Sequence, residues 1–233
     1  MSKVSFFLPV RKGSERVLNK NTRLFAGIEG GLVANKLRQL AEMKNVDEVI
    51  LSTNDEISIN VAEKYLPSFP KLRIEKRPDS LCSSSTKLID LIKYVPDITD
   101  AEHVLWGHVT TPLVTGKMYD GAIVAYKESL LKGYDSLISV TPFQNFLLDA
   151  NGKMVNNDTN LEWPRTQDLK PLYEINHAMF IAPITLYTMG KRSGVRPKLY
   201  EISGLRAHDI DWEEDFIVGE QLFYYLRSKN EEV

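Results

Sequence analysis

The sequence predicts an α/β fold built on an open, mostly parallel sheet with helices on both faces. From residue 4 to residue 140, short apolar runs alternate with longer runs that have helical spacing. The apolar runs are unbroken, which is typical of strands buried on both faces of a sheet. The length of 233 residues suits one domain of this class, or one domain that carries a subdomain.

The first elements follow this rhythm. Val4–Val10 is an unbroken apolar strand, and Leu32–Met43 has apolar residues at helical spacing. Glu48–Ser52 is the second predicted strand. The next three residues, Thr53 to Asp55, offer N-cap side chains before a helix that passes through Tyr65.

The same pattern continues to residue 140. Leu72–Glu75 is the third predicted strand, and Ser84–Tyr94 is a helix with leucine and isoleucine on one side. His103–His108 is the fourth strand, Gly116–Leu131 a long helix and Ser136–Val140 the fifth strand. Strands and helices in turn imply a parallel sheet covered on both faces.

The alternation stops between residues 141 and 175, where no period holds for long. Within this segment, LDANGKMV places an Asn-Gly turn between two apolar runs, which predicts a β-hairpin. An irregular segment of this length inside a compact domain is usually functional or interacting. The strand pattern resumes at Ala178–Ala182, and a last helix is predicted over Glu213–Arg227.

Composition favours an ordinary globular protein. The net charge of −2 gives no general attraction to nucleic acid or to an anionic membrane. Cys82 is the single cysteine, so no intramolecular disulfide forms, which fits a reducing cytoplasm. The apolar N-terminal run is broken by Pro9 and is too short for a signal peptide, and no run approaches the roughly 20 apolar residues of a membrane span. We therefore expect a cytoplasmic protein.

A basic loop follows the first strand and predicts a small anionic ligand. Arg11, Lys12, Arg16 and Lys20 fall within ten residues, at the sheet edge where α/β proteins bind ligands. Neither the dinucleotide fingerprint nor the P-loop pattern is present. Backbone N–H groups around Gly13 and Ser14, together with the cationic side chains, could still cradle a polyphosphate. The alternative is a solvated basic turn.

Two carboxylates near the C-terminus predict a Mg²⁺ site. Asp209 and Asp211 flank Ile210, and in an extended segment such residues point the same way. Two carboxylates and the phosphate oxygens of a substrate form a normal Mg²⁺ site. The alternative is that one of the two aspartates caps the last helix.

Hydrogen-bonding side chains also gather between residues 163 and 180. Arg165 offers a fork that fits carboxylates, and Gln167 and Tyr173 lie close by in the sequence. His177 precedes an apolar run, so a structural role is as good an interpretation as a ligand contact. His108 ends a strand at the ligand-binding edge and is the stronger candidate.

Several segments together resemble one enzyme family. They are the opening loop Pro9–Asn21, Ser52-Thr53-Asn54-Asp55, Arg77-Pro78-x-x-Leu81, His108-Val109-Thr110-Thr111-Pro112-Leu113, Arg165-Thr166-Gln167-Asp168-Leu169, Asn176-His177-Ala178 and Asp209-Ile210-Asp211. In this order, and over nearly the whole chain, they resemble the cytidylyltransferases that activate sugar acids. Within that family they are most similar to the acylneuraminate (CMP-sialic acid synthetase) group.

The resemblance implies a reaction. CMP is transferred from CTP to the anomeric hydroxyl of a 2-keto sugar acid, pyrophosphate is released, and the product serves cell-surface glycan and lipopolysaccharide synthesis. It also implies one cytidylyltransferase domain over residues 1–233, with residues 141–175 as an arm that mediates homodimerisation. The implied roles are catalysis for Arg11, Lys20 and Asp211, nucleotide binding for Arg11, Gly13, Ser14, Lys20, Asn21 and Arg77, sugar-acid binding for His108, Arg165, Gln167 and Tyr173, and Mg²⁺ binding for Asp209 and Asp211.

The departures from the family pattern concern the sugar. Lys12, Arg16 and Asn19 replace family glycines, so the loop is stiffer and more basic. His108 replaces a glutamine and His177 a glycine, both where the sugar is expected. Synthetases for Kdo, pseudaminic or legionaminic acid therefore remain alternatives. A nucleotide-binding homologue without catalysis is a further alternative.

Overall fold

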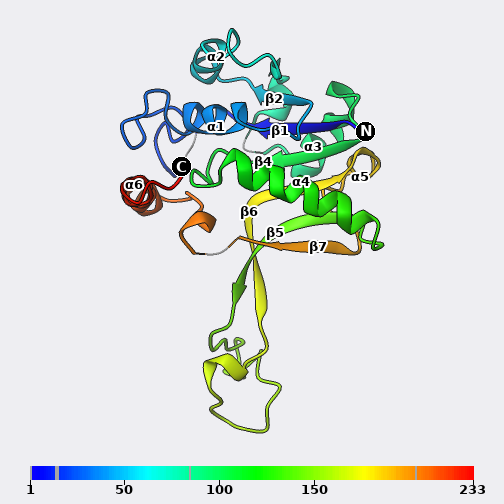
Figure 1. Cartoon of the computed structure of the whole chain (residues 1–233), viewed down its shortest axis with the longest axis vertical. Coiled ribbons are helices and arrows are strands. Elements are labelled where there is room, and N and C mark those ends of the chain that lie inside the picture. Colours follow the sequence, from blue (N-terminus) through cyan, green and yellow to red (C-terminus); the bar gives the residue numbers. More distant parts are fainter. Residues whose placement is uncertain (1, 14–15, 84, 203) are drawn as a thin grey trace.

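The computed structural model describes residues 2–13, 16–83, 85–202 and 204–233. Within these residues, seven strands form one sheet in the order β3-β2-β1-β4-β6-β5-β7 (Figure 1). The strands are β1 (Val4–Pro9), β2 (Glu48–Thr53), β3 (Leu72–Lys76), β4 (His103–Gly107), β5 (Ser136–Phe143), β6 (Leu172–Pro183) and β7 (Pro197–Glu201).

The sheet is mostly parallel, as predicted. β1 pairs in parallel with β2 and β4, β2 with β3, and β5 with β7. β6 is antiparallel to both of its neighbours, β4 and β5. The carboxyl ends of β1 and β4 therefore lie at the same edge, which brings the basic loop beside the segment that begins at His108.

Helices cover both faces of the sheet. They are α1 (Gly31–Ala41), α2 (Glu56–Glu63), α3 (Leu88–Ile98), α4 (Gly116–Leu130), α5 (Ile184–Thr188) and α6 (Glu213–Ser228). Side chains of α1, α2, α4 and α6 share one buried cluster, whereas those of α3 and α5 share a second. β1 supplies Phe6 and Leu8 to the first cluster and Phe7 to the second, as alternate residues of a doubly buried strand should.

One strand was not predicted, and two predicted boundaries were wrong. β7 was not predicted, because PKLYE begins with proline and stays partly exposed, as edge strands do. β6 begins at Leu172, six residues before the predicted strand, because its first residues pair with β5 outside the core and are mostly exposed. α3 begins at Leu88 instead of residue 84, after Lys87 in an extended conformation.

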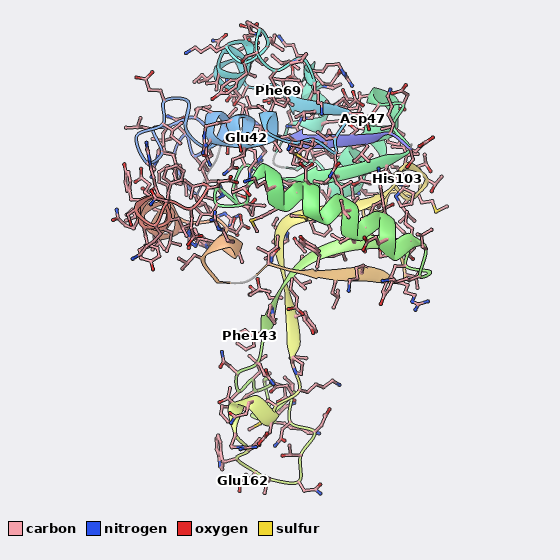
Figure 2. The ribbon with its side chains drawn as sticks, viewed as in Figure 1. Glu42, Asp47, Phe69, His103, Phe143 and Glu162 are labelled. Carbon is pink, nitrogen blue, oxygen red and sulfur yellow. The ribbon has the colours of Figure 1, made fainter. Side chains whose placement is uncertain are left out.

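The ends of β5 and β6 leave the sheet together and carry the arm, residues 144–171 (Figures 1 and 2). Pro142 pairs with Tyr173, and Phe143 with Leu172, so the base of the arm is a two-stranded ribbon. The predicted hairpin is confirmed by a bridge between Leu148 and Met154. No helix within the described residues is both long and apolar enough to cross a lipid bilayer.

A bulge in β6 re-aims His177. Four β6 residues lie opposite Ser139 of β5, and the Ser139 hydroxyl bridges the gap by accepting from the Met179 N–H at 2.9 Å. His177 has φ of 56°, a left-handed conformation that is uncommon outside glycine. The resemblance expects a glycine at this position, and the φ of His177 is one that glycine adopts more readily than histidine.

Candidate active site

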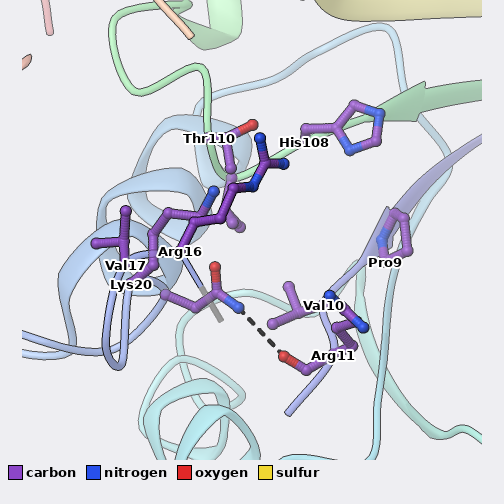
Figure 3. A pocket seen from close by; sticks show the side chains of 10 residues that line it. Pro9, Val10, Arg11, Arg16, Val17, Lys20, His108 and Thr110 are labelled. Atoms are coloured by element: carbon purple, nitrogen blue, oxygen red, sulfur yellow. Dashed lines mark hydrogen bonds between the residues drawn. The ribbon is translucent and has the colours of Figure 1, made fainter. Parts of the chain in front are cut away.

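A pocket of about 270 Å³ lies at the carboxyl ends of β1 and β4 (Figure 3). The end of β1 and the basic loop form one wall, and His108, Val109 and Thr110 form the other. The basic side chains that line it are Arg11, Arg16 and Lys20. Three cations that line one pocket at this edge are better explained by a polyphosphate ligand than by a solvated basic turn.

The basic loop is fixed by one hydrogen bond within itself and by two to other parts of the fold. The Asn21 side-chain amide donates to the Arg11 carbonyl at 3.2 Å (Figure 3), and the Asn21 carbonyl accepts from the Val33 N–H of α1 at 2.9 Å. The Lys20 ammonium donates to the Ile210 carbonyl at 2.7 Å. Gly13 has φ of +75°, so glycine is favoured there by the backbone conformation. Ser14, assigned to the nucleotide from the sequence, lies outside the described residues.

α6 holds the far part of the same loop. Arg23 donates to both carboxylate oxygens of Glu213, at 3.1 and 2.6 Å, and its guanidinium lies 3.7 Å from the Phe216 ring centroid. Phe25 packs edge-on against Phe216 and Phe223. The acidic first turn of α6 therefore anchors the loop that carries the cations.

The aspartate pair lies between this loop and α6. Ile210 is fully buried, and its N–H donates to the Thr110 carbonyl at 2.9 Å, which ties the pair to the pocket wall. Asp209 Oδ1 is buried and has no hydrogen-bond partner among the described residues. Asp211 is exposed and forms an ion pair with Arg16 at 3.0 Å. The two carboxylates are thus close to the cations of the loop.

Neither aspartate is needed as the cap of α6. The Asp215 carboxylate accepts from the backbone N–H of Asp211 at 3.0 Å and from that of Trp212 at 2.8 Å. Asp215 therefore does the capping that the sequence left open as an alternative role for Asp209 or Asp211. Both carboxylates remain available to a ligand.

The donor set fits a magnesium ion that shares its coordination with a substrate. Burial raises the pKa of Asp209 and the nearby charge of Asp211 raises it further, whereas a hydrogen bond with Thr110 and the charge of Lys20 lower it. Within the described ranges no group of three or more His, Cys, Asp or Glu side chains is arranged to hold a metal. A Mg²⁺ ion at this pair would complete its shell with phosphate oxygens and water, as Mg²⁺ usually does.

A second pocket, of about 570 Å³, lies on the other side of the aspartates. Asp209 and Asp211 line it, together with residues of β6 and of the segment before α6. Its other polar lining residues are Thr141, Glu174, Asn176, His177, His208 and Asp215. The carboxylate pair therefore lines the mixed polar pocket and is joined to the basic pocket through the contacts of Ile210 with Thr110 and Lys20 and of Asp211 with Arg16.

His108 lines the basic pocket but is neutral. Burial, and after it the charge of Arg192, lower its pKa to about 3. The unperturbed value of about 6.5 predicts a switch near physiological pH, and that expectation is wrong because the ring lies in a partly buried, positively charged place. A neutral imidazole both donates and accepts, as the glutamine that the resemblance expects here would.

Arg77 lies beneath the basic loop. It is buried, and its guanidinium donates to the Val10 carbonyl. The backbone N–H of Arg77 donates to the Thr53 carbonyl at 3.0 Å. It lines neither of the two pockets. The structure thus places it where it orders the turn between β1 and the loop, and its contact with cytidine stays a prediction.

The predicted sugar residues of the arm are not brought to the pockets within one chain. Arg165 is paired with Asp168 at 2.8 Å, and the Gln167 carbonyl accepts from the Gln144 side chain at 3.1 Å. Tyr173 lines a separate groove at the base of the arm. Sequence reasoning did not assign Arg16 or Thr110 to the site. The charge match between the cationic loop and the aspartate pair was the signal that could have found Arg16.

Residues 6–230 match the protein family described as Cytidylyltransferase, and the chain belongs to this family. It is similar to the CMP-N,N'-diacetyllegionaminic acid synthase of Legionella pneumophila, with 28% identity over 92% of this chain and 94% of that protein. It is also similar to the pseudaminic acid cytidylyltransferase of Campylobacter jejuni, with 27% identity over 71% and 72% of the two chains.

The fold has a counterpart among solved structures. The 4-diphosphocytidyl-2C-methyl-D-erythritol synthase of Anaerococcus prevotii superposes with a TM-score of 0.67 at 13% identity, covering 96% of each chain. At this identity the likeness concerns the fold. The chain is accordingly an enzyme of the cytidylyltransferase kind.

Proposed function

We propose that the enzyme transfers CMP from CTP to the anomeric hydroxyl of a nonulosonic acid, a 2-keto sugar acid of the sialic acid type, and releases pyrophosphate. The observation that carries this proposal is that Asp209 and Asp211 line the polar pocket and flank Ile210, whose backbone bonds to Thr110 and Lys20 of the basic pocket. CTP fits the basic pocket, and the sugar acid fits the second. The names of the relatives, which refer to legionaminic and pseudaminic acid, support a substrate of this class.

The protein's part in this reaction is to position charge. The anomeric oxygen attacks the α-phosphorus, the bond to the β-phosphate oxygen breaks, and pyrophosphate leaves with the electron pair. Arg11, Arg16 and Lys20 would stabilise the negative charge that spreads over the phosphate oxygens. Lys20 is already oriented by its bond to the Ile210 carbonyl. A Mg²⁺ ion held by Asp209 and Asp211 supplies neutralisation of phosphate charge and a lower pKa for the attacking hydroxyl.

Arg16 has two partners available in this scheme. In the free enzyme it pairs with Asp211, although both side chains are about half exposed, so the pair contributes little to stability. A triphosphate in the pocket offers a stronger, multiply charged partner. Arg16 would then move from Asp211 to the phosphates and leave the carboxylate free for the metal.

The assembly and setting of the enzyme are part of the same proposal. We propose a homodimer in which the arm contacts the second copy, because exposed apolar side chains such as Leu161 and Trp163 lie on it. A cytoplasmic location and a role in cell-surface glycan or lipopolysaccharide synthesis fit a CMP-sugar product. The single cysteine, Cys82, agrees with a reducing compartment.

The test is pyrophosphate release from CTP with a panel of sialic, legionaminic, pseudaminic and Kdo acids. We expect turnover of at least one nine-carbon acid with CTP, poor turnover with ATP or GTP, and loss of activity in EDTA. Turnover of Kdo alone would assign the enzyme to the eight-carbon class. No turnover of any acid, with CTP still bound, would favour a homologue without catalysis.

Asp211→Ala tests the metal pair within this assay. We expect kcat to fall roughly a hundredfold or more, since one charge-stabilising group at comparable sites contributes about 3 kcal/mol. Asp215→Ala removes the cap of α6 and keeps both aspartates of the pair, and because Asp215 also lines the second pocket, it serves as a control for stability and not for turnover. Near wild-type turnover of folded Asp211→Ala would leave Asp211 with no role in catalysis.

A further inference from the structure

The guanidinium of Arg192 lies on an aromatic layer beside the basic pocket. Arg192 belongs to the connection between α5 and β7, and its guanidinium carbon lies 3.8 Å from the Phe180 ring centroid and 5.4 Å from that of Trp106. Phe180 and Trp106 are direct cross-strand neighbours on β6 and β4. Tyr187 of α5 stacks on Trp106 with its ring centroid at 6.4 Å.

This arginine has no anionic or hydrogen-bonding partner in the part of the chain that the structure describes. None of the ion pairs or side-chain hydrogen bonds among the described residues includes Arg192. The contacts of its guanidinium are with the Phe180 and Trp106 rings. Burial lowers its pKa, yet an arginine stays charged at any physiological pH. Burying half of a charged side chain without an anionic partner costs desolvation free energy, so the presence of Arg192 at this position indicates a ligand.

Two more polar atoms in the same layer are unused. Trp106 Nε1 and the Tyr187 hydroxyl are buried and have no hydrogen-bond partner among the described residues. Native proteins satisfy nearly all such groups, with protein atoms, water or a ligand. An anion at this layer would find one guanidinium fork and two nearby donors.

Arg192 itself lines neither pocket, but its aromatic layer adjoins one lining residue of each. The Trp106 and His108 rings lie 6.2 Å apart, and His108 lines the basic pocket. The Phe180 and His177 rings lie 6.3 Å apart, and His177 lines the second pocket. Among the charged groups that lower the pKa of His108, Arg192 has the largest effect, which places its charge close to that ring.

We propose that Arg192 binds the carboxylate of the acceptor sugar acid. This assignment rests on the proposed function. In a 2-keto sugar acid the carboxylate is bonded directly to the anomeric carbon, so a guanidinium fork that grips it also orients the attacking hydroxyl. The triphosphate already meets Arg11, Arg16 and Lys20 on the opposite wall. Arg165, the arginine that the sequence assigns to the sugar acid, is paired with Asp168 in the arm.

The test compares the sugar acid with its C1 primary amide, which has the same shape without the charge. Wild-type enzyme should prefer the acid. Arg192→Met keeps an apolar stem on the aromatic layer, and we expect it to raise KM for the acid roughly 10- to 100-fold. The ratio of kcat/KM for acid over amide should fall to about one, and KM for CTP should stay unchanged. Arg192→Lys should recover only part of the preference, because it keeps the charge and loses the fork.

Arg196→Met is the matched control. Arg196 also stacks on an aromatic ring, with its guanidinium carbon 5.0 Å from the Tyr134 centroid, but this ring is not one of those next to His108 and His177. It should leave the acid-to-amide ratio as in the wild type. Should Arg192→Met fail to fold, Arg192→Gln carries the same comparison.

An unchanged acid-to-amide ratio in a folded Arg192 variant would overturn the assignment and leave the proposed function standing. An equal rise in KM for CTP and for the acid would also overturn it, since it would place Arg192 on the phosphates. Failure of the wild-type enzyme to use any sugar acid would overturn the proposed function and the assignment together.

Discussion

His108 shows how one residue's surroundings decide its chemistry. Its ring is neutral because burial and the charge of Arg192 oppose protonation, and burial has the larger effect. The pKa of about 3 in the folded protein lies below the unperturbed value of about 6.5. As the pH falls, the unfolded chain therefore takes up this proton first. The stability linked to neutral His108 is present above pH 6.5 and is lost as the pH falls toward 3.

We therefore expect His108→Gln to make stability less sensitive to acid. Relative to the wild type, the variant should gain on the order of 2 kcal/mol in unfolding free energy between pH 7.5 and pH 5, because glutamine does not titrate. Urea unfolding at the two pH values measures this difference. The sequence assigns His108 to the sugar acid, whereas the ring lines the pocket proposed for CTP, so in kinetics the variant should change KM for CTP at least as much as KM for the sugar acid. Parallel stability profiles would show that His108 is not held neutral.

Lys36 is a second unusual residue, and it supports the pocket wall from below. It is fully buried on α1, and its ammonium donates to the carbonyls of Thr111 and Val114 and to the Tyr119 hydroxyl, at 2.9, 3.2 and 3.1 Å. No carboxylate compensates its charge in the described part of the chain, and burial holds its pKa well below 10.5. These three acceptors take up all three N–H groups of the Lys36 ammonium, so Lys36 fixes the segment that follows His108.

Lys36→Met should loosen this segment. Each buried acceptor left without a donor costs about 1–3 kcal/mol, so we expect a loss of stability and a lower kcat. The stability gap to the wild type should widen as the pH rises from 7 toward 10.5, because the folded wild type releases its lysine proton before the unfolded chain does. Urea unfolding at pH 7 and 9.5 tests this, with the exposed Lys153→Met as control. A gap independent of pH would contradict a lowered pKa.

At the scale of elements, α6 determines where the basic loop lies. Phe216 of α6 is buried, and it contacts both the Phe25 ring and the Arg23 guanidinium of the loop. The Ala26 N–H donates to Glu220 of the same helix at 2.7 Å. A helix at the end of the chain thus orders a loop near its beginning, and the aspartate pair lies in the connection that enters α6.

We expect Phe216→Leu to weaken CTP binding without touching the pocket. Losing part of the ring from a packed site costs about 1–2 kcal/mol, and the loop that carries Arg11 and Lys20 should become less ordered. KM for CTP should rise several-fold. Ile217→Ala on the exposed side of α6 is the matched control and should change little. Equal CTP kinetics in both variants would mean that the loop does not depend on α6.

Elements with a strong period were predictable, and those that depend on distant partners were not. The doubly buried β1 and the long α4 follow from apolar spacing alone. β7 has no apolar pattern that would predict a strand. It is a strand because its backbone pairs with β5. At the site, charges found on one loop identified Arg11 and Lys20, whereas Arg192 was missed because only the sheet brings it to Trp106.

At the scale of the whole molecule, one chain does not bring all of its predicted site residues to the two pockets. The arm carries Arg165 and Gln167 away from the sheet (Figure 1), although the resemblance assigns both to the sugar acid. Phe146 and Trp163 pack together on the arm, yet Trp163 stays 72% exposed, which suits burial by a second copy. In a two-fold dimer each arm would meet the body of the other subunit.

This arrangement predicts complementation between two inactive variants. Asp211→Ala damages the body and keeps the arm, whereas Arg165→Ala damages the arm and keeps the body. If the arm acts across the dimer, a mixed dimer holds one site with both parts intact, and it also holds one site in which both parts are damaged. Random mixing of equal amounts yields half mixed dimers, so about a quarter of wild-type activity should appear.

The two variants are unfolded and refolded together, because preformed dimers exchange subunits slowly if they exchange at all. Size-exclusion chromatography with light scattering checks the dimer, and Trp163→Ser should shift it toward monomer. Activity no greater than the mean of the two separate variants would show that each arm serves its own chain, or that it has no part in the site.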